Sequence, residues 1–124
     1  MKQISTPNAP AAIGPYSQAI SNGGFIFVSG QLPIDPATGA FPEGGVEAQT
    51  RQSLTNIKSI LEAAGSGMDK VLKTTVLLAD MGDFGAMNGV YAEFFGEPYP
   101  ARCAFAVKTL PKGALVEIEC VAAE

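Results

Sequence analysis

The residues best suited to chemistry in this chain are one arginine and two glutamates near its carboxyl end. Arg102 opens the apolar run 103–107, and Glu117 and Glu119 alternate with apolar residues in the run 115–122. An arginine presents a rigid fork that binds a carboxylate through two parallel hydrogen bonds. A nearby glutamate can take or give a proton. Together these residues predict a pocket for a small carboxylated substrate, with hydrolytic or proton-transfer chemistry.

Three further polar side chains are candidates for this pocket, and each also has a purely structural interpretation. Tyr16 either faces a ligand or packs over a sheet edge. Ser29 ends an apolar strand just before Gly30, so it either faces a ligand or only ends the strand. Asn88 borders the apolar stripe of a helix, where its amide needs hydrogen-bond partners in any case. Likewise, Arg102 could end a strand in solvent, and the two glutamates could line the wet face of an antiparallel strand.

The composition argues against several classes of protein. The net charge is -4, and the 8 basic residues form no tract or stripe, whereas nucleic-acid binding needs cations that replace the counterions of phosphate. The chain has no histidine and only two cysteines, so neither a metal site nor a Ser-His-Asp or Cys-His pair is expected. No apolar run approaches the ~20 residues that span a bilayer, and residues 1–7 lack the apolar core of a signal peptide. We therefore expect a cytoplasmic protein with no membrane or nucleic-acid partner.

The scarcity of charged residues predicts self-association. Charged residues make up 16% of the chain, against about 25% in a typical soluble domain. A small monomer normally covers its large surface with charge, so part of this surface is expected to lie against other subunits. The alternative is a surface rich in uncharged polar residues. A chain of 124 residues builds one core, and we expect a single domain over residues 1–124.

Periodicity and turn residues predict five strands and two helices. The predicted strands are residues 16–20, 24–29, 71–79, 102–107 and 115–122, and the predicted helices are residues 46–64 and 84–95. Leu54, Ile57 and Leu61 recur at helical spacing, and Asn22-Gly23 is typical of a hairpin turn. Residues 25–28 are continuously apolar, which predicts a strand covered on both faces. The first dozen residues are expected to be irregular.

This order of elements predicts an α+β fold. Strand-helix-strand connections within one sheet give parallel, right-handed pairing, while the opening hairpin and the turn at residues 110–113 add antiparallel partners. The result is a mixed β-sheet with two helices packed on one face, in which the last two strands form a simple hairpin. The open face of the sheet again requires a partner surface. Cys103 is expected to be a small buried hydrophobic residue rather than a reactive thiol.

Five short motifs follow one another along the chain. They are Gly14-Pro15-Tyr16-Ser17-Gln18-Ala19, Val28-Ser29-Gly30-Gln31-Leu32-Pro33, Asp83-Phe84 with Asn88 and Tyr91, Pro100-Ala101-Arg102, and Val116-Glu117-Ile118-Glu119. In this combination the chain resembles the Rid family, the reactive-intermediate (enamine/imine) deaminases, in its RidA branch. The resemblance runs from about residue 5 to the end, with no large gap.

The resemblance implies a chorismate-mutase-like α+β fold and a homotrimer. It also implies that the last strand is inserted between the first core strand and the strand near Val76, so that the strands of Arg102 and Glu117 need not be neighbours. Active sites in such trimers lie in clefts between subunits. The resemblance implies no metal and no organic cofactor.

The resemblance also assigns roles to individual residues. Arg102 would hold the substrate carboxylate, and Glu117 would position and activate water. The rest of the pocket would comprise Tyr16, Ser29, Gly30 and Asn88. Many relatives carry Ser and then Cys just after the arginine, whereas this chain has Cys103 and then Ala104. Both positions could still bind substrate through the backbone, but a thiol at the second position is missing.

The implied reaction is a hydrolytic deamination. A 2-aminoacrylate-type enamine tautomerises to a 2-imino acid, water adds at the imine carbon, and ammonia leaves to give a 2-keto acid. Because an imine is already electrophilic, the enzyme needs only orientation, a carboxylate clamp and one proton shuttle. Such a site works without histidine.

Two other functions fit parts of the pattern. A trimeric binder or sensor of small keto acids or related carboxylates would use the same Arg102 but would not need a water-activating Glu117. An RNA-directed nuclease or translation inhibitor, a role also proposed for some relatives, agrees poorly with the acidic balance and the absence of histidine.

Overall fold

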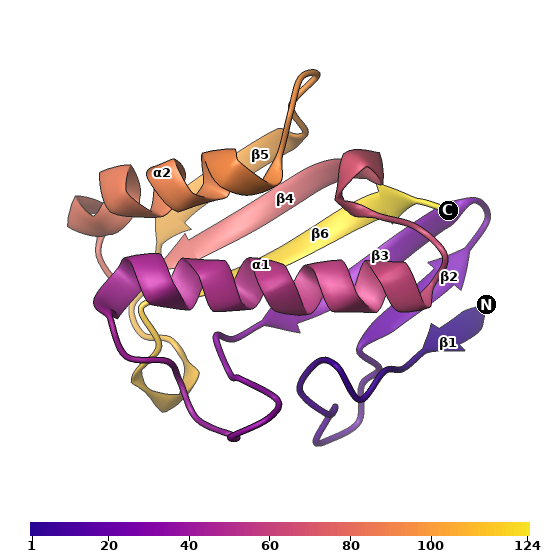
Figure 1. Cartoon of the computed structure of the whole chain (residues 1–124), viewed down its shortest axis with the longest axis horizontal. Helices are drawn as coiled ribbons and strands as arrows, with labels where there is room; N and C mark the ends of the chain where they lie inside the picture. Colours follow the sequence, from indigo (N-terminus) through magenta and orange to yellow (C-terminus); the bar gives the residue numbers. More distant parts are fainter.

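The computed structural model describes residues 1–124, which form six strands, two α-helices and three short 3₁₀ turns (Figure 1). The strands are β1 (Lys2–Ile4), β2 (Ala19–Asn22), β3 (Phe25–Gln31), β4 (Val71–Leu78), β5 (Ala101–Ala106) and β6 (Val116–Ala123). The helices are α1 (Gly45–Ala63) and α2 (Phe84–Phe94), and the 3₁₀ turns are η1 (Met68–Lys70), η2 (Met81–Asp83) and η3 (Pro111–Gly113). All predicted elements are present within a few residues of their expected ends. β1 is an additional strand, in a stretch that was expected to be irregular.

The six strands form one mixed sheet in the order β1-β2-β3-β6-β4-β5. Only β4 and β5, which are connected through α2, run parallel, and all other neighbours are antiparallel. Both helices cover the same face of the sheet (Figure 1). The α+β fold with two helices on one face of a mixed sheet is therefore confirmed, and so is the inserted final strand that the family resemblance implies.

The simple hairpin between the last two strands is wrong. β5 is an edge strand that pairs only with β4, whereas β6 lies between β3 and β4. The connection between them, residues 107–115, includes η3 and is longer than the loop of about 2–5 residues that closes a tight hairpin. This longer connection carries the chain past β4, and β6 then gains backbone hydrogen bonds along both of its edges.

The core lies between the helices and the covered face of the sheet. Leu54, Ile57 and Leu61 of α1 are fully buried, because their spacing puts them on one side of the helix. They face alternate residues of the central strands, such as Val76 and Ile118, which are also fully buried. Since side chains alternate along a strand, the intervening residues of β4 and β6 point to the opposite, open face.

The open face carries large apolar side chains that nothing in the single chain covers. Phe25 and Phe27 of β3 are 45% and 50% exposed, and Phe105 of β5 is 47% exposed. The prediction that residues 25–28 are covered on both faces is therefore wrong for one chain, because only Ile26 and Val28 point into the core. Large apolar side chains exposed on one face of a sheet are typical of a surface that meets another protein.

The two cysteines lie in different environments. Cys120 of β6 is buried, and burial, with a smaller effect of Glu119, raises the pKa of its thiol to about 12. Cys103, which was expected to be buried, is exposed. It pairs with Thr75 in the parallel β4–β5 ladder and lies on the open face of the sheet. No element of the same chain covers this face, so Cys103 is not buried in a single chain.

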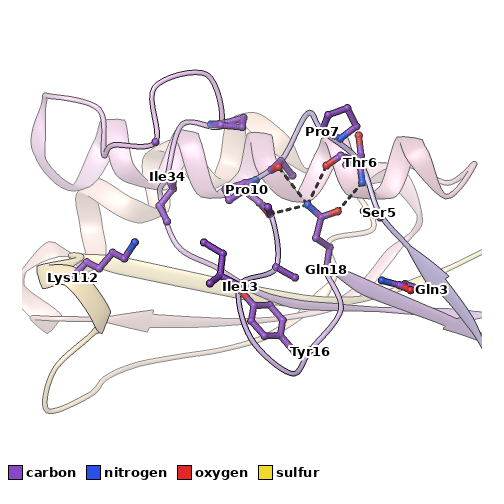
Figure 2. A pocket seen from close by; sticks show the side chains of 15 residues that line it. Gln3, Ser5, Thr6, Pro7, Pro10, Ile13, Tyr16, Gln18, Ile34 and Lys112 are labelled. Atoms are coloured by element: carbon purple, nitrogen blue, oxygen red, sulfur yellow. Dashed lines mark hydrogen bonds between the residues drawn. The ribbon is translucent and has the colours of Figure 1, made fainter.

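One buried side-chain amide holds the amino-terminal segment in place. Gln18 donates from Nε2 to the carbonyl oxygens of Thr6 (3.1 Å), Ala9 (3.3 Å) and Pro10 (2.8 Å). Its Oε1 accepts a hydrogen bond of 2.7 Å from the backbone N–H of Thr6. Figure 2 shows these bonds converging on Gln18. Residues 6–10, between β1 and β2, are thus fixed although they form no helix or strand.

A second buried amide does the same for the loop after β3. Asn56 of α1 is fully buried and donates from Nδ2 to the carbonyl oxygens of Leu32 (3.3 Å) and Ile34 (2.9 Å). Its Oδ1 accepts a hydrogen bond of 2.9 Å from Gln52 Nε2. The hydrogen-bonding groups of this side chain are therefore used to tie the loop to the helix.

Replacing Asn56 tests this tie. Asn56→Ala leaves the carbonyl groups of Leu32 and Ile34 without their donor, so it should lower the free energy of unfolding by about 1–3 kcal/mol. Thr55→Ala is the control, because the exposed Thr55 bonds only Arg51 of its own helix and should change stability by no more than about 0.5 kcal/mol. Urea unfolding at one fixed protein concentration measures the free energy of unfolding of both variants and of the parent. Equal midpoints for the two variants would contradict the role of Asn56.

Candidate functional site

Glu117 lies on the open face of β6, in a cavity of about 560 Å³. The residues that line it are Tyr16, Ser29, Gly30, Leu32, Leu77, Pro111, Glu117 and Glu119. Four predicted site residues from three separate parts of the chain therefore meet here. They do so because β3 pairs with β6, with a shift in register between Val28 and Gln31 that exposes the backbone around Gly30.

The carboxyl group of Glu117 lies directly against Gly30. A Cβ atom at position 30 would come within 3.1 Å of Glu117 Cδ and 3.2 Å of its Oε2. Such distances are tighter than most Cβ contacts, so a larger residue at position 30 would require the carboxylate to shift by a few tenths of an ångström. The lack of a side chain at Gly30 is what allows the carboxylate to lie beside the backbone of β3.

Two effects raise the pKa of Glu117 above its ordinary value. The larger is its partial burial, which disfavours the charged form, and the second is repulsion from the neighbouring carboxylate of Glu119. No cation of the same chain offsets them, because the two ion pairs of the structure, Arg51–Glu93 and Lys58–Glu62, involve other acids. A carboxyl group with a raised pKa is better matched to proton transfer near neutral pH.

Tyr16 and Ser29 are held at the rim of this cavity by the strand pairing beneath them. Ser29 Oγ donates to the carbonyl oxygen of Ser17 at 2.6 Å, and the backbone N–H of Ser29 donates to the carbonyl oxygen of Gln18. These bonds fix the chain next to Tyr16, whose ring is about half exposed. The hydroxyl of Ser29 is therefore used as a donor within the protein, and only its lone pairs remain for a ligand.

Arg102 lies in a different cavity, of about 440 Å³, at the edge of the helical layer. Its Nη1 donates to Asn88 Oδ1 at 2.7 Å. Its Cζ lies 4.7 Å from the ring centroid of Tyr91 and 5.3 Å from that of Phe84, so the guanidinium group lies over two aromatic rings of α2 within cation–π distance. No acid of the chain pairs with Arg102, which leaves part of its fork for a ligand.

The aromatic support of Arg102 is itself fixed. Tyr91 is buried, and its hydroxyl shares a hydrogen bond of 2.8 Å with Thr74 Oγ1. Burial raises the pKa of Tyr91, although the bond to Thr74 and the nearby Arg102 partly oppose this. Because Thr74 and Arg102 are partners in the parallel β4–β5 ladder, the same register places the arginine over the ring and the hydroxyl beside it.

A single chain does not bring Arg102 and Glu117 into one pocket. Arg102 shares the helix-covered face with its partner Thr74, whereas Glu117 pairs with Leu77 on the open face. Asn88 accompanies Arg102, and Tyr16 accompanies Glu117. The expectation from the sequence of one pocket for both charges is therefore wrong within one chain, because the two strands present them on opposite sides of the sheet.

The two residues after the arginine line neither cavity. Cys103 is exposed on the open face. Ala104 is half-buried and packs against the core on the helix-covered side. Their predicted binding role stays a prediction, and it would involve the exposed backbone of the edge strand.

Sequence reasoning missed the apolar part of both cavities. Leu32, Leu77 and Pro111 form walls around Glu117, and Tyr91 and Phe84 carry Arg102. Because residues 76–78 are all apolar, the sequence did not show which face of the strand Leu77 occupies. No local pattern could assign it to the strand of Glu117, because that depends on where β6 inserts.

Two further features bear on the kinds of site that the structure offers. It contains no cluster of three or more His, Cys, Asp or Glu side chains that could hold a metal ion. None of its helices combines the length and the apolar character needed to cross a bilayer.

The model of the family described as endoribonuclease L-PSP matches residues 6–124. The chain belongs to this family. Its motifs at Tyr16, Ser29-Gly30, Arg102 and Glu117 all lie within the matched residues.

Individual relatives agree with this family. A RutC family protein of Pyrococcus horikoshii is 59% identical over 96% of this chain and 94% of its own. The 2-iminobutanoate/2-iminopropanoate deaminase of Capra hircus is 54% identical over 98% of this chain and 88% of its own. The crystal structure of E. coli TdcF with bound serine superposes with a TM-score of 0.94 at 43% identity, over 100% of this chain and 99% of that one.

The geometry around Glu117 yields a testable shift in its pKa. Glu119→Gln removes the like charge that raises the pKa of Glu117, so this pKa should fall towards the ordinary value of a glutamate. It should stay above that value, because burial is the larger cause and remains. An NMR titration with carbon-13 in the glutamate carboxyl groups measures the shift.

The control for this titration is Glu62→Gln, which changes an exposed acid of α1 on the other side of the sheet. It should leave the pKa of Glu117 unchanged. The raised pKa also means that the charged form of Glu117 costs stability, a cost that is absent below the unfolded-state pKa and complete above the folded-state pKa. If the pKa of Glu117 is the same in Glu119→Gln as in the parent, the two carboxylates do not interact.

Proposed function

We propose that this protein is a hydrolase that deaminates reactive 2-aminoacrylate-type enamines and their 2-imino acid tautomers to 2-keto acids and ammonia. The observation that carries the proposal is the pairing of chemistries in the two cavities. One holds an arginine that is bonded to Asn88 but paired with no acid, and the other holds a glutamate of raised pKa beside apolar walls. The names of the mammalian relatives, among them the deaminase of Capra hircus, support the same reaction.

The site is proposed to form between copies of the chain in a homotrimer. Arg102 of one subunit would meet Glu117 of the next, because neither cavity alone contains both groups. The exposed phenylalanines of the open face and the low charge of 16% support such an assembly. The charges favour it as well, since one half of the site is a cation without an acid and the other is a pair of acids without a cation.

The proposed mechanism needs one clamp and one proton carrier. The planar fork of Arg102, supported by Tyr91 and Asn88, binds the substrate carboxylate through two hydrogen bonds. Glu117 takes a proton from a water molecule, whose oxygen attacks the imine carbon and forms a tetrahedral aminoalcohol. Glu117 then returns the proton to the amino group. Glu117 then carries the proton of the remaining hydroxyl to the departing nitrogen, so that the C–N bond breaks, ammonia leaves and the carbonyl of the 2-keto acid forms.

Two alternatives use the same residues differently. A sensor of small keto acids would need the fork of Arg102 but no proton carrier, so the loss of catalysis in a Glu117 variant separates the two functions. The family description names an endoribonuclease. The net charge of -4 and the two acids in the cavity disfavour a phosphate backbone there, and the proposal does not rest on that description.

The role of Glu117 is tested by Glu117→Gln, which keeps the shape and the hydrogen-bonding capacity but cannot take a proton at neutral pH. Deamination, followed as keto-acid release in a coupled serine or threonine dehydratase assay, should fall by about 10²–10⁴-fold. Keto-acid binding measured by calorimetry should change much less. Glu119→Gln is the matched control on the same face of β6 and should be milder. Parental turnover in Glu117→Gln would refute the catalytic assignment.

The shared site is tested by mixing two inactive variants. In a trimer of Arg102→Ala alone, every site lacks the arginine. In a trimer of Glu117→Gln alone, every site lacks the glutamate. After random exchange of subunits, about a quarter of the interfaces combine an intact Arg102 with an intact Glu117, so about a quarter of the parental activity should return. A chain that carries both substitutions, mixed with inactive Arg102→Ala, should restore nothing. Sedimentation should show a trimer for each variant and for the mixture. A mixture that stays inactive despite proven exchange would place the site within one chain.

A further inference from the structure

Strand β3 carries a β-bulge directly beside Glu117. The pairing of β3 with β6 passes from Val28 to Gln31 with a shift in register, so that Ser29 and Gly30 together stand opposite one residue of β6. Two residues that face one define a bulge, and a bulge changes the direction in which the strand presents its residues. At this bulge Gly30 lies against the carboxyl group of Glu117. The surroundings of the acid therefore depend on the bonds that hold the bulge in place.

The residues before β2 hold the bulge through Ser29. The backbone N–H of Ser29 donates to the carbonyl oxygen of Gln18 at 3.0 Å, and Ser29 Oγ donates to the carbonyl oxygen of Ser17 at 2.6 Å. In a hydrogen-bonded antiparallel pair, two opposite residues normally exchange both of their N–H···O bonds. Here only one of the two bonds is present, because the backbone N–H of Gln18 does not bond the carbonyl oxygen of Ser29. This carbonyl group lacks the partner that regular pairing with Gln18 would supply.

The side chain of Gln31 provides a donor for this carbonyl group. Gln31 Nε2 donates to the carbonyl oxygen of Ser29 at 3.1 Å. Because a trans peptide group is planar, the carbonyl of Ser29 and the N–H of Gly30 point in opposite directions. The bond from Gln31 therefore fixes the orientation of the whole peptide group between Ser29 and Gly30. A glycine gives this peptide group unusual freedom to turn, so its orientation depends on such a bond.

We propose that Gln31 is a positioning residue for Glu117, which it influences through the bulge at Ser29 and Gly30. The inference rests on the proposed function. Gln31 is 5% exposed and pairs with the fully buried Ile118, so its side chain lies on the helix-covered face of the sheet. It does not line the cavity of Glu117 and makes no contact with a substrate there. Its effect on the acid is carried by the peptide group that it orients.

Loss of this donor has a definite consequence for Glu117. A peptide group that is free to turn takes the backbone of Gly30 away from the carboxyl group, which water then reaches more easily. Burial is the larger cause of the raised pKa of Glu117, so this pKa falls when the bulge loosens. The other titratable side chains of the cavity are Glu119 and Tyr16, and a change at Gln31 leaves both of them in place.

Gln31→Met tests the positioning role, since methionine has nearly the same length as glutamine but no N–H donor. The pKa of Glu117, measured by NMR titration with carbon-13 in the glutamate carboxyl groups, should fall towards the ordinary value of a glutamate. Turnover should fall by about ten- to a hundredfold, because a displacement of about 1 Å at a reacting group can cost this much. Keto-acid binding, measured by calorimetry, should change by no more than about twofold, because Arg102 and its supports are unaltered.

The pH profile of turnover gives a second readout of the same change. The proposed reaction needs the ionised form of Glu117, so the limb of the profile that rises with pH follows the pKa of this residue. This limb should move to lower pH in Gln31→Met. The assay is the coupled dehydratase assay, with the supply of enamine held equal at each pH. A loss of stability alone would leave the limb where it is in the parent.

The matched control is Ser66→Ala. Ser66 Oγ donates to the carbonyl oxygen of Ala123 at 2.6 Å, so this change also removes a bond from a side-chain donor to a strand carbonyl, but at the far end of β6. It should lower the midpoint of urea unfolding, whereas turnover and the pKa of Glu117 should stay at their parental values. The positioning role is refuted if Gln31→Met leaves the pKa of Glu117 unchanged, or if Ser66→Ala lowers it equally.

Two further measurements separate the possible failures. A parent that releases no keto acid refutes the proposed function, whereas the NMR titration still tests the effect of Gln31 on Glu117. If Gln31→Met does not fold, hydrogen exchange in the parent takes its place. The side-chain amide protons of Gln31 should exchange with solvent more slowly than those of the exposed Gln3. Equal exchange rates would mean that Gln31 keeps no lasting bond to the bulge, which would overturn the inference.

Discussion

The pairing of β6 along both of its edges is the constraint on which the rest of the structure depends. Inserted between β3 and β4, this strand cannot slip by one residue without turning Ile118 and Cys120 out of the core and two carboxylates into it. The same register puts Glu117 beside Gly30 on one neighbour and Leu77 on the other. The acid is thus positioned by the most buried strand of the sheet, although its carboxyl group faces outward.

The local sequence predicts the elements well but not how they combine. Helical spacing identified the buried face of α1 at Leu54, Ile57 and Leu61, because it depends only on neighbouring turns of one helix. The place of β6 depends on pairing between residues far apart in the chain, and only the family resemblance indicated it. The side of the sheet to which Arg102 points could not be predicted either, because it follows from its register with Thr74 in β4.

The two halves of the proposed site differ in how their charges are supported. Arg102 rests on Tyr91 and Phe84 and is bonded to Asn88, so neutral groups hold it in place. Glu117 has a like charge beside it in Glu119. Each half is electrostatically incomplete without the other. The chain therefore places a cation without an acid, and two acids without a cation, at the surfaces where its copies would meet, although its overall charge content is low.

The support beneath Arg102 has a consequence for turnover inside a cell. A guanidinium group that is already held in its working orientation loses little conformational freedom when a carboxylate arrives, so binding needs little rearrangement. In the proposed reaction, the 2-keto acid product keeps the carboxylate by which Arg102 would bind the imino acid. Substrate and product therefore compete for the same prepared fork, and the accumulated keto acid would occupy the sites. If the proposed reaction holds, the local balance of keto acid and imine, rather than the amount of protein alone, would set the rate of deamination.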